Sequence, residues 1–337
     1  MKIDLVYLWV DGSDEKWAAK KNAALLAAGR VPATAATDNR YADNDELKYS
    51  LRSASTFAPW INHIYILTDG QRPAWLADNP RVTVIDHKDV IPKEYLPVFN
   101  SNAIEMFLGF IPGLSEHFLY ANDDFFFNRH VAPDFFFDKN GNPIVIMQEK
   151  PWRASVFETG NPGPIIARDK SFKLFVANTV HFIYKKTCRK YHVMLTHAIE
   201  PMRKSYFVEN FNENADEILR TTVTKFRADS NLQRTLFPLL DNAKGRNTIT
   251  LKRRFFGRRV KYCGCHPILW HIAMLSGLLT GLAKTDIVDS VRNTTAKIKR
   301  RRPILVALND ISADNNVFEK NRKYMIEMFP EKSEFEK

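Results

Sequence analysis

Four short apolar runs, each ending at an acidic or glycine-containing turn, constrain the fold of this chain more than any other feature. The runs span residues 3–10, 63–70, 81–87 and 118–121. Continuous runs of Val, Ile, Leu and Tyr are typical of strands buried on both faces of a parallel sheet. Residues 45–60 have a helical pattern that places Leu47, Leu51 and Ala54 on one face. Because strands alternate with helices, the sequence predicts an α/β fold with a mostly parallel sheet flanked by helices.

Two adjacent carboxylates, Asp123 and Asp124, follow the fourth run directly after Asn122. The first run ends in Asp11-Gly12, and the second ends in Asp69-Gly70. Ligands of open α/β sheets bind beyond the carboxyl ends of the strands, so we expect these three turns to converge on one crevice. An isolated Asp-Asp pair is more often an ordinary acidic turn. The repetition of acidic turns after successive strands favours a ligand site.

Four sequence blocks resemble, in order, the Stealth family of sugar-phosphate transferases. The first is IDLVYLWVDGSD, and the second runs from RYADNDELKYSLRS to LYANDDFFFNR, so the resemblance is nearly continuous over residues 3–138. A weaker third block covers residues 196–204 and 225–233, and a short fourth block covers residues 307–337. The family includes bacterial capsule polymerases and the catalytic part of the animal enzyme that attaches N-acetylglucosamine-1-phosphate to lysosomal glycoproteins.

The resemblance implies a nucleotide-sugar-binding fold (GT-A or Rossmann-like) and the transfer of a hexose together with its phosphate. The implied donor is a UDP-sugar such as UDP-GlcNAc, and the implied acceptor is a carbohydrate hydroxyl in capsular or cell-surface polysaccharide synthesis. The nucleotide product would be UMP. A GT-A glycosyltransferase that transfers only the sugar and releases UDP would use the same fold and acidic motif. A non-catalytic polyanion or membrane binder is a further alternative, which leaves the acidic turns unexplained.

Phosphoryl transfer needs a cation, a fixed guanidinium and a base for the attacking hydroxyl. Asp124 is the candidate metal ligand for Mg²⁺ or Mn²⁺, while Asp123 is either a ligand or the base, and the sequence does not separate these roles. Asn309 and Asp310 follow another apolar run and are the second source of metal ligands. Taken alone, these two residues are better explained as the N-cap of a helix.

The third block supplies His197 as an acid or base, and Arg227, whose planar fork suits phosphate oxygens. Lys225 and Lys204 are auxiliary candidates for phosphate binding, although a surface position is the default for lysine. Further candidates for donor binding lie in the first two blocks. They are Trp9, Asp11, Gly12, Asp69 and Gly70 at the strand ends, and Arg52, Ser101, Asn102 and Glu105 elsewhere. Residues 100–105 also have the pattern of a helix start, so part of this set is explained by capping.

Composition indicates a soluble enzyme, because 45% of the 337 residues are hydrophobic and 26% are charged. Three cysteines form no disulfide framework and suggest a reducing compartment. The sequence Cys263-Gly264-Cys265-His266 lacks a second Cys/His pair, so we interpret these cysteines as incidental thiols. We expect no signal peptide, and the apolar residues 268–283 are shorter than the roughly 20 residues of a spanning helix. The expected location is cytoplasmic, at most peripheral to the inner face of the bacterial cell membrane.

The formal charge of +11 is concentrated in two basic segments, residues 252–261 (KRRFFGRRVK) and 297–302 (KIKRRR). Basic residues beside phenylalanines suit an anionic membrane surface or a polyanionic acceptor. We expect no nucleic acid partner because no recognition module is present, and a solvated basic face is the plain alternative. The predicted organisation is a catalytic domain over residues 1–240, a basic helical insertion over 243–303, and a C-terminal segment over 304–337 that returns to the active site.

Overall fold

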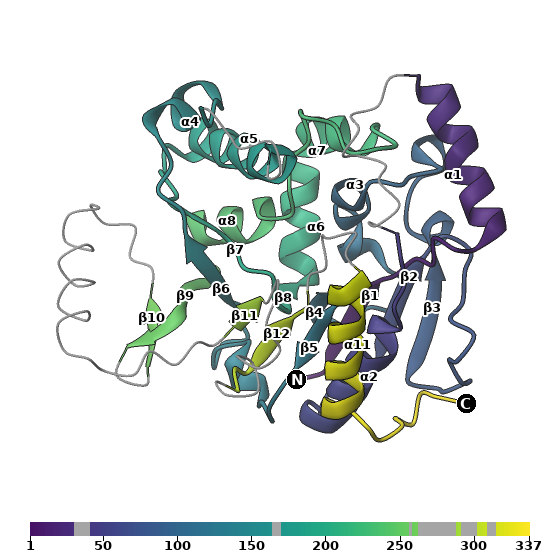
Figure 1. Ribbon diagram of the computed structural model, residues 1–337. Helices are drawn as coiled ribbons and strands as arrows, with labels where there is room; N and C mark the ends of the chain where they lie inside the picture. Colours follow the sequence, from purple (N-terminus) through teal and green to yellow (C-terminus); the bar gives the residue numbers. More distant parts are fainter. Residues whose placement is uncertain (30–40, 164–169, 256–257, 262–287, 291–301, 309–314) are drawn as a thin grey trace.

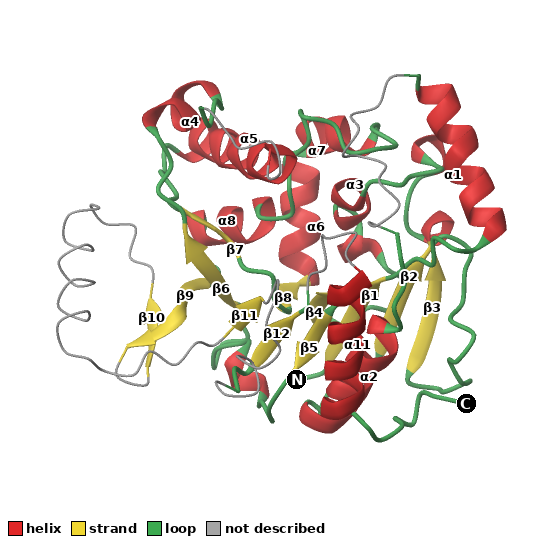
Figure 2. Cartoon of the chain, in the orientation of Figure 1, coloured by secondary structure: helices red, strands yellow, loops and turns green. Residues whose placement is uncertain are grey.

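The computed structural model describes residues 1–29, 41–163, 170–255, 258–261, 288–290, 302–308 and 315–337 (Figures 1 and 2). The strands are β1 (Ile3–Leu8), β2 (Ile64–Thr68), β3 (Val82–Asp86), β4 (His117–Asn122), β5 (Phe125–Phe127), β6 (Ile144–Glu149), β7 (Val193–Leu195), β8 (Glu200–Arg203), β9 (Thr248–Phe255), β10 (Arg258–Lys261), β11 (Val288–Ser290) and β12 (Leu305–Ala307). The helices are α1 (Glu15–Ala28), α2 (Glu46–Phe57), α3 (Ser101–Glu105), α4 (Ala154–Thr159), α5 (Lys170–Thr187), α6 (Lys204–Glu213), α7 (Ala215–Thr222), α8 (Leu236–Ala243) and α11 (Asn315–Met328).

The main sheet has the strand order β3-β2-β1-β4-β8. Strands β3, β2, β1 and β4 are parallel, and β8 runs antiparallel to β4 at the edge. These four parallel strands are the four apolar runs of the sequence, so the predicted α/β fold is confirmed. Leu8 of β1 pairs with Leu67 of β2 and with Asn122 of β4, which brings the carboxyl ends of the three strands to one level. The three predicted acidic turns therefore leave the sheet at the same edge.

Both faces of the sheet are covered, because successive side chains of a strand point to opposite sides. Val6 of β1 belongs to a core formed with helices α5 to α8, and Leu5 belongs to a second core formed with α2. Leu47, Leu51 and Ala54 of α2 all lie in this second core, as their helical spacing predicts. The continuous apolar runs follow from this arrangement, since a strand covered on both faces has no solvent side.

Two smaller sheets extend the molecule beyond β4. One has the order β10-β9-β6-β7 and the other the order β11-β12-β5. Strand β5 begins directly after the acid pair, and β12 pairs with it antiparallel, with Ala307 opposite Phe125. The N–H of Leu308 donates to the carbonyl of Asp124 at 3.0 Å, so the C-terminal segment approaches the acid pair at this point, and its return to an active site stays a prediction.

The basic segment at residues 252–261 is part of a β-hairpin, formed by β9 and β10. Our expectation of a helical insertion is therefore wrong for this part, since β9 also pairs in parallel with β6 and so belongs to a sheet. The alternating Thr248 to Leu251, Thr-Ile-Thr-Leu, is a β-strand pattern that the basic residues obscured. The predicted apolar helix at residues 268–283, the Cys263 to His266 cluster and the basic segment 297–301 lie outside the described residues. Within the described part of the chain, no helix combines the length and the apolar character needed to cross a bilayer.

Candidate active site

The turns after β1 and β2 are held side by side by one side chain that the sequence did not single out. The Gln71 amide accepts from the N–H of Asp11 at 3.0 Å and donates to the Asp11 carbonyl at 2.8 Å. Gly70 has a φ of 73°, which explains the glycine in this turn. Gly12 has a different reason, since a Cβ there would lie 2.5 Å from the carbonyl oxygen of Tyr41. The glycine thus permits a close approach of two backbones.

Four carboxylates gather around the end of β4. The pKa of Asp123 is raised well above its usual range by burial and by the charges of Asp124 and Asp43. The pKa of Asp124 is raised by burial and by the charge of Glu46. Burial and the charge of Asp123 raise the pKa of Glu46 to about 8, while burial and the charges of Asp45 and Asp11 raise that of Asp43 to about 6. Carboxyl groups kept this close favour bound protons or a bound cation.

Asp43 and Glu46 were missed in the sequence analysis. Asp43 lies in the turn before α2, and Glu46 is the first residue of that helix. Glu46 accepts from the N–H of Asn44 at 2.6 Å, and Asp43 accepts from the N–H of Asp45 at 3.1 Å. Asp45 has a φ of 65°, a left-handed conformation that is uncommon for a residue other than glycine and often marks a functional turn. The signal was present as a run of acids, Asp43, Asp45 and Glu46, inside the second sequence block.

The carboxylates at this turn are the ligand type that a hard divalent cation prefers, and their mutual repulsion is what such a cation would relieve. Among the described residues, however, no three His, Cys, Asp or Glu side chains are placed to hold one ion. Asn309 and Asp310, the predicted second source of ligands, lie outside the described residues. The backbone hydrogen bond between Leu308 and Asp124 places the residue before Asn309 next to the acid pair. The predicted metal site requires this proximity.

Helix α3 is attached to the loop of the third sequence block. Asn100 is the N-cap of α3, and its amide donates to the Thr224 hydroxyl and to Asn231 Oδ1, both at 2.9 Å. The predicted capping role of this segment is therefore confirmed. The guanidinium of Arg227 donates to Ser101 Oγ at 2.6 Å, so two predicted site residues from different blocks are in direct contact. Lys225 is exposed on the same loop, and its carbonyl accepts from the Phe99 N–H at 2.8 Å.

His197 lies between β7 and β8 and contacts the residue that follows the acid pair. Its ring is 6.4 Å from the ring of Phe125, the residue that follows Asp124, and 5.8 Å from the ring of Phe172. His197 therefore contacts the start of β5, and its role as an acid or base stays a prediction. Lys204 is not brought there, because β8 runs antiparallel to β4 and its last residue, Arg203, pairs with His117 at the opposite end of that strand.

Arg52 lies away from the acidic turn. Its guanidinium forms two hydrogen bonds with the carboxylate of Glu336, at 2.8 and 2.7 Å, and donates to the carbonyls of Phe329 and Pro330. This side chain therefore attaches α2 to the C-terminal segment. Its predicted contact with the donor would require these bonds to be exchanged, which makes a structural role the simpler account.

A buried ion cluster lies directly behind the acid pair, and sequence reasoning found only one of its members. Arg234 forms ion pairs with Glu105 on α3 at 3.0 Å and with Glu200 on β8 at 2.7 Å. Its guanidinium stacks on the ring of Tyr120 with 4.9 Å to the ring centroid. Glu105 was predicted to contact the donor, whereas the partners Arg234, Glu200 and Tyr120 were not predicted at all.

Buried polar atoms without a hydrogen-bond partner, among the described residues, gather at this edge of the sheet. At this edge they are Trp9 Nε1, Thr68 Oγ1, Asp69 Oδ2, His87 Nδ1, Asn102 Nδ2 and Glu105 Oε2, while one more, Trp152 Nε1, lies elsewhere, after β6. The Trp9 indole is close enough to Asp43 to lower the pKa of that carboxyl, but it falls short of a full hydrogen bond. Burial lowers the pKa of His87 to about 4, so its ring is neutral. Unpaired buried groups are costly, so their concentration at one edge indicates a place where a polar ligand binds.

Lys20 of α1 reaches the same edge, where it forms an ion pair with Asp69 at 2.5 Å. The other oxygen of this carboxylate has no partner among the described residues. Trp9, Asp11, Gly12, Asp69 and Gly70 therefore lie together at the ends of β1 and β2, as expected. Their contact with a nucleotide stays a prediction.

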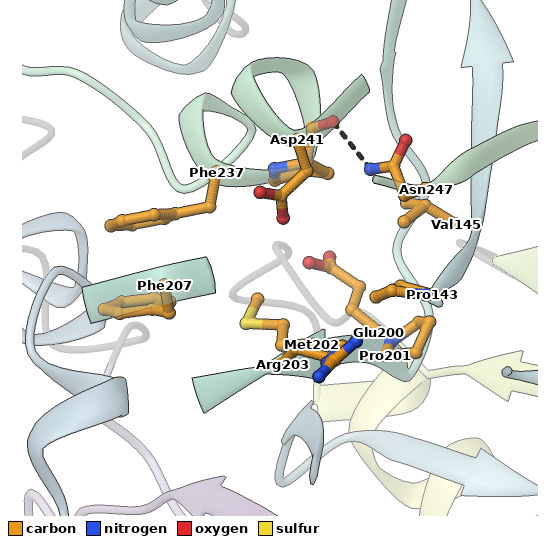
Figure 3. Close-up of a pocket in the computed structure, with 11 residues that line it drawn as sticks. Pro143, Val145, Glu200, Pro201, Met202, Arg203, Phe207, Phe237, Asp241 and Asn247 are labelled. Atoms are coloured by element: carbon orange, nitrogen blue, oxygen red, sulfur yellow. Dashed lines mark hydrogen bonds between the residues drawn. The ribbon is translucent and has the colours of Figure 1, made fainter. Parts of the chain in front are cut away.

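Two hollows lie away from the acid pair. The first, of about 10 Å³, is lined by residues of β6, β8, α6 and α8, with Glu200, Met202 and Asp241 facing it (Figure 3). A space of this size holds about one water molecule, so it is not a donor site. The second is an open hollow of about 530 Å³, whose lining includes His130, Asp134, Thr248 and Thr250.

The comparisons with known proteins point to one family. Residues 1–28 match conserved region 1 of the Stealth proteins, and residues 40–145 match conserved region 2. The chain is 37% identical over 251 residues to the capsular polysaccharide phosphotransferase LcbA of Neisseria meningitidis, which is 73% of this chain and 66% of that protein. It is also 37% identical over 233 residues to the capsular polysaccharide phosphotransferase cps1A of Actinobacillus pleuropneumoniae, which is 68% of this chain and 62% of that protein.

The matched region thus spans less than two thirds of the length of these curated relatives. Among solved structures, the galactosyltransferase LgtC superposes with a TM-score of 0.42 at 12% identity over 98% of both chains, a likeness too distant to carry an argument. Both conserved regions contain the residues that converge at the carboxyl ends of β1, β2 and β4. The chain belongs to the Stealth protein family.

Proposed function

We propose that the chain is a capsular or exopolysaccharide phosphotransferase that moves a hexose-1-phosphate from a UDP-sugar, such as UDP-N-acetylhexosamine, to a carbohydrate hydroxyl. The observation that carries the proposal is the convergence of distant blocks at one edge of the sheet. The ring of His197 lies 6.4 Å from the ring of Phe125, the residue that follows Asp124, and Ser101 contacts Arg227. The names of the similar proteins, which are capsular and exopolysaccharide phosphotransferases, support the same activity.

In the proposed reaction the acceptor oxygen attacks the phosphorus that carries the sugar. A new O–P bond forms, the bond between that phosphorus and the bridging oxygen breaks, and UMP leaves with the electron pair. Asp123 or His197 takes the proton of the attacking hydroxyl. Arg227 binds the phosphate oxygens on which charge develops, and Ser101 fixes the orientation of its guanidinium. The bond between the anomeric carbon and its oxygen stays intact.

The proposed cofactor is Mg²⁺ or Mn²⁺. Asp124 and Asp123 would hold it together with Asn309 and Asp310, and it would neutralise charge on the diphosphate. The raised pKa values of the neighbouring carboxyl groups support a cation at this place.

The test is incubation with a panel of nucleotide sugars and a short oligosaccharide acceptor, followed by identification of the released nucleotide. The proposal expects UMP and a phosphodiester-linked product. Release of UDP would instead show a glycosyltransferase on the same fold. Binding without any turnover would favour a polyanion or membrane binder.

We assign the basic hairpin segment, residues 252–261, to docking on an anionic membrane surface. Each basic residue near such a surface contributes on the order of 1 kcal/mol, so replacing Arg253, Arg254, Arg258 and Arg259 with Gln should release the protein from acidic vesicles. Transfer to a short soluble acceptor should survive. Unchanged vesicle binding with loss of transfer to a long anionic acceptor would identify an acceptor track, and no change in either would identify a solvated face.

A further inference from the structure

The Arg234 cluster combines full burial with an excess of negative charge. The side chains of Arg234, Glu105 and Glu200 are 8%, 3% and 3% exposed. One guanidinium serves two carboxylates, and Glu105 Oε2 still has no partner among the described residues. Apolar residues of similar volume often stabilise a fold as well as a buried ion cluster does. Stability alone therefore does not explain charges at this position.

Tyr120 connects this cluster to the acid pair. Its ring lies under the guanidinium of Arg234, and its hydroxyl is 3.1 Å from Glu105 Oε1 and 2.8 Å from Asn122 Oδ1. The single hydroxyl proton is shared between these two oxygens. Asn122 is the last residue of β4 and immediately precedes Asp123. The connection thus runs from Glu200 and Arg234 through Tyr120 to the residue from which the acidic turn begins.

The same cluster also fixes α3. Glu105 and Asn102 lie three residues apart on this helix and both have a buried polar atom without a partner in the described chain. Arg234 holds Glu105, while Arg227 contacts Ser101 at the start of the helix. Two segments that the proposed reaction uses, the acidic turn and α3, are therefore tied to one buried arginine.

We propose that Arg234 and Tyr120 are positioning residues, which hold Asn122 with the Asp123-Asp124 turn and Glu105 on α3 in one fixed arrangement. The inference rests on the proposed function and adds residues outside its catalytic set. In the proposed reaction neither residue is assigned a contact with the reacting atoms. Their substitution should slow turnover without weakening donor binding.

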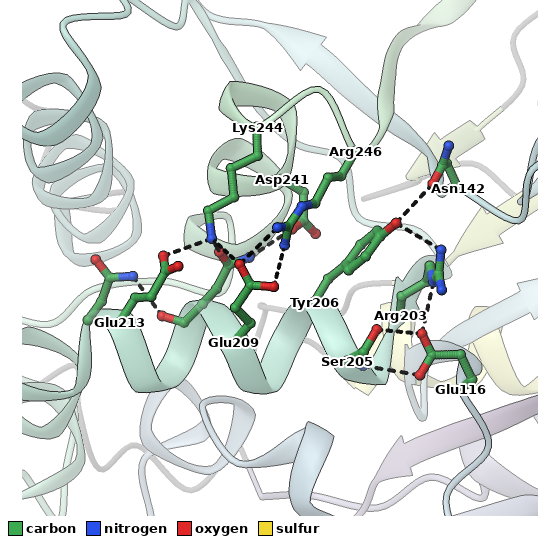
Figure 4. Close-up of polar contacts among 12 residues, drawn as sticks. Glu116, Asn142, Arg203, Ser205, Tyr206, Glu209, Glu213, Asp241, Lys244 and Arg246 are labelled. Atoms are coloured by element: carbon green, nitrogen blue, oxygen red, sulfur yellow. Dashed lines mark hydrogen bonds and ion pairs between the residues drawn. The ribbon is translucent and has the colours of Figure 1, made fainter.

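The test compares two isosteric substitutions, Tyr120→Phe and Tyr206→Phe. Tyr206 is a matched control, because its hydroxyl lies 2.8 Å from Arg203 and 3.2 Å from Asn142, and Arg203 and Arg246 stack on its ring (Figure 4). We expect Tyr120→Phe to lower kcat by about 10- to 100-fold with little change in the donor KM, as loss of an outer hydrogen-bonding partner does elsewhere. Tyr206→Phe should retain wild-type kcat. Equal losses in both variants, or a rise in KM alone, would overturn the inference.

A second variant keeps the test sharp if Tyr120→Phe folds poorly. Arg234→Lys retains the positive charge but loses the planar fork that reaches both carboxylates. We expect the same loss of kcat with the midpoint of thermal unfolding lowered by only a few degrees. Wild-type kcat in Arg234→Lys would show that only the charge matters, and the positioning role would be rejected.

Hydrogen exchange separates this inference from the proposed function. If the wild-type protein released UDP or no nucleotide, the proposed function would fail. Exchange in a peptide covering residues 118–127 can still be measured. Faster exchange at the acidic turn in Tyr120→Phe, and not in Tyr206→Phe, would support positioning, whereas identical exchange in all three proteins would contradict it.

Discussion

Two networks of arginines, tyrosines and carboxylates occupy different environments in this molecule. The inner network comprises Glu105, Tyr120, Glu200 and Arg234, behind the acid pair. The outer network comprises Glu209 and Glu213 of α6 with Lys244 and Arg246 after α8 (Figure 4). Both contain an arginine that stacks 4.9 Å from a tyrosine ring centroid. In the outer network Lys244 is 24% and Glu209 is 40% exposed, against 8% or less in the inner one.

The pKa values of the carboxyl groups are shifted in opposite directions in the two networks, although each group is paired with an arginine. Burial raises the pKa of Glu200 although Arg234 binds it directly. Hydrogen bonds from Arg246 and Lys244 lower the pKa of Glu209 to about 2, because that group is well hydrated and desolvation is small. The direction of the pKa shift in these ion pairs therefore depends more on how well the carboxyl group is hydrated than on the geometry of the pair.

The largest expected effect tests whether activity depends on the acid pair, next to the inner network, and not on the outer network. Asp124→Ala, and Asp310→Ala by the proposed metal role, should each lower turnover by several orders of magnitude while the fold stays intact. Glu213→Gln in the outer network is the control and should leave turnover unchanged. Nucleotide release and circular dichroism check both statements. Full activity of the aspartate variants in EDTA would contradict the metal proposal.

The second effect concerns stability. Arg234→Met leaves two buried carboxylates without a counter-ion, so the free energy of unfolding should fall by about 3–5 kcal/mol. Arg246→Met removes a comparable pair from a half-exposed site and should cost about 1 kcal/mol or less. Urea denaturation of the two variants measures the difference. Equal losses would show that the two networks are energetically alike.

A third, smaller effect concerns the predicted phosphate-binding arginine. Arg227→Lys retains the charge but loses the fork that Ser101 orients, so kcat/KM should fall by about 10- to 100-fold, the range for lost orienting contacts. Arg220→Lys is the control, because Arg220 is 75% exposed and pairs with Glu217 on its own helix. Wild-type kinetics for both variants would indicate a surface role for Arg227.

The smallest effect concerns Asp241 of α8, which lies next to the outer network but has a raised pKa like the buried carboxyl groups of the inner one. Burial raises the pKa of Asp241 from 3.8 to about 6. The native state therefore binds more protons than the unfolded state between about pH 4 and 6, and this group makes stability fall as pH rises through that window. Asp241→Asn keeps an acceptor for the Asn210 amide, which donates at 2.7 Å.

The Asp241→Asn substitution should raise the free energy of unfolding above pH 6 by on the order of 1–3 kcal/mol. It should also make this free energy less dependent on pH between pH 4 and 6. Urea denaturation as a function of pH provides the measurement. An unchanged slope would mean that the Asp241 carboxyl is solvated after all.

The sequence was informative where a local pattern decides the structure. Apolar runs predicted β1 to β4, and the rule for parallel sheets placed Asp11, Asp69 and Asp123 at one edge. The sequence did not predict contacts between residues that are far apart in the chain, such as the ion pair of Glu105 and Arg234, which are separated by 129 residues. Lys204 was misplaced because the direction of β8 depends on pairing with β4, which no local pattern records.

The bond between the Leu308 N–H and the Asp124 carbonyl has a consequence for the order of events during synthesis. The ribosome makes β1 to β4 and both conserved regions long before it reaches β12, so the acidic turn exists for many seconds without its neighbour. During that interval β5 has no paired neighbour, because its partner in the sheet β11-β12-β5 is β12, and Phe125 to Phe127 have no strand opposite them. A nascent chain of 240 residues would therefore be prone to pair with another chain at β5, and chaperone capture at that stage would protect the future active site.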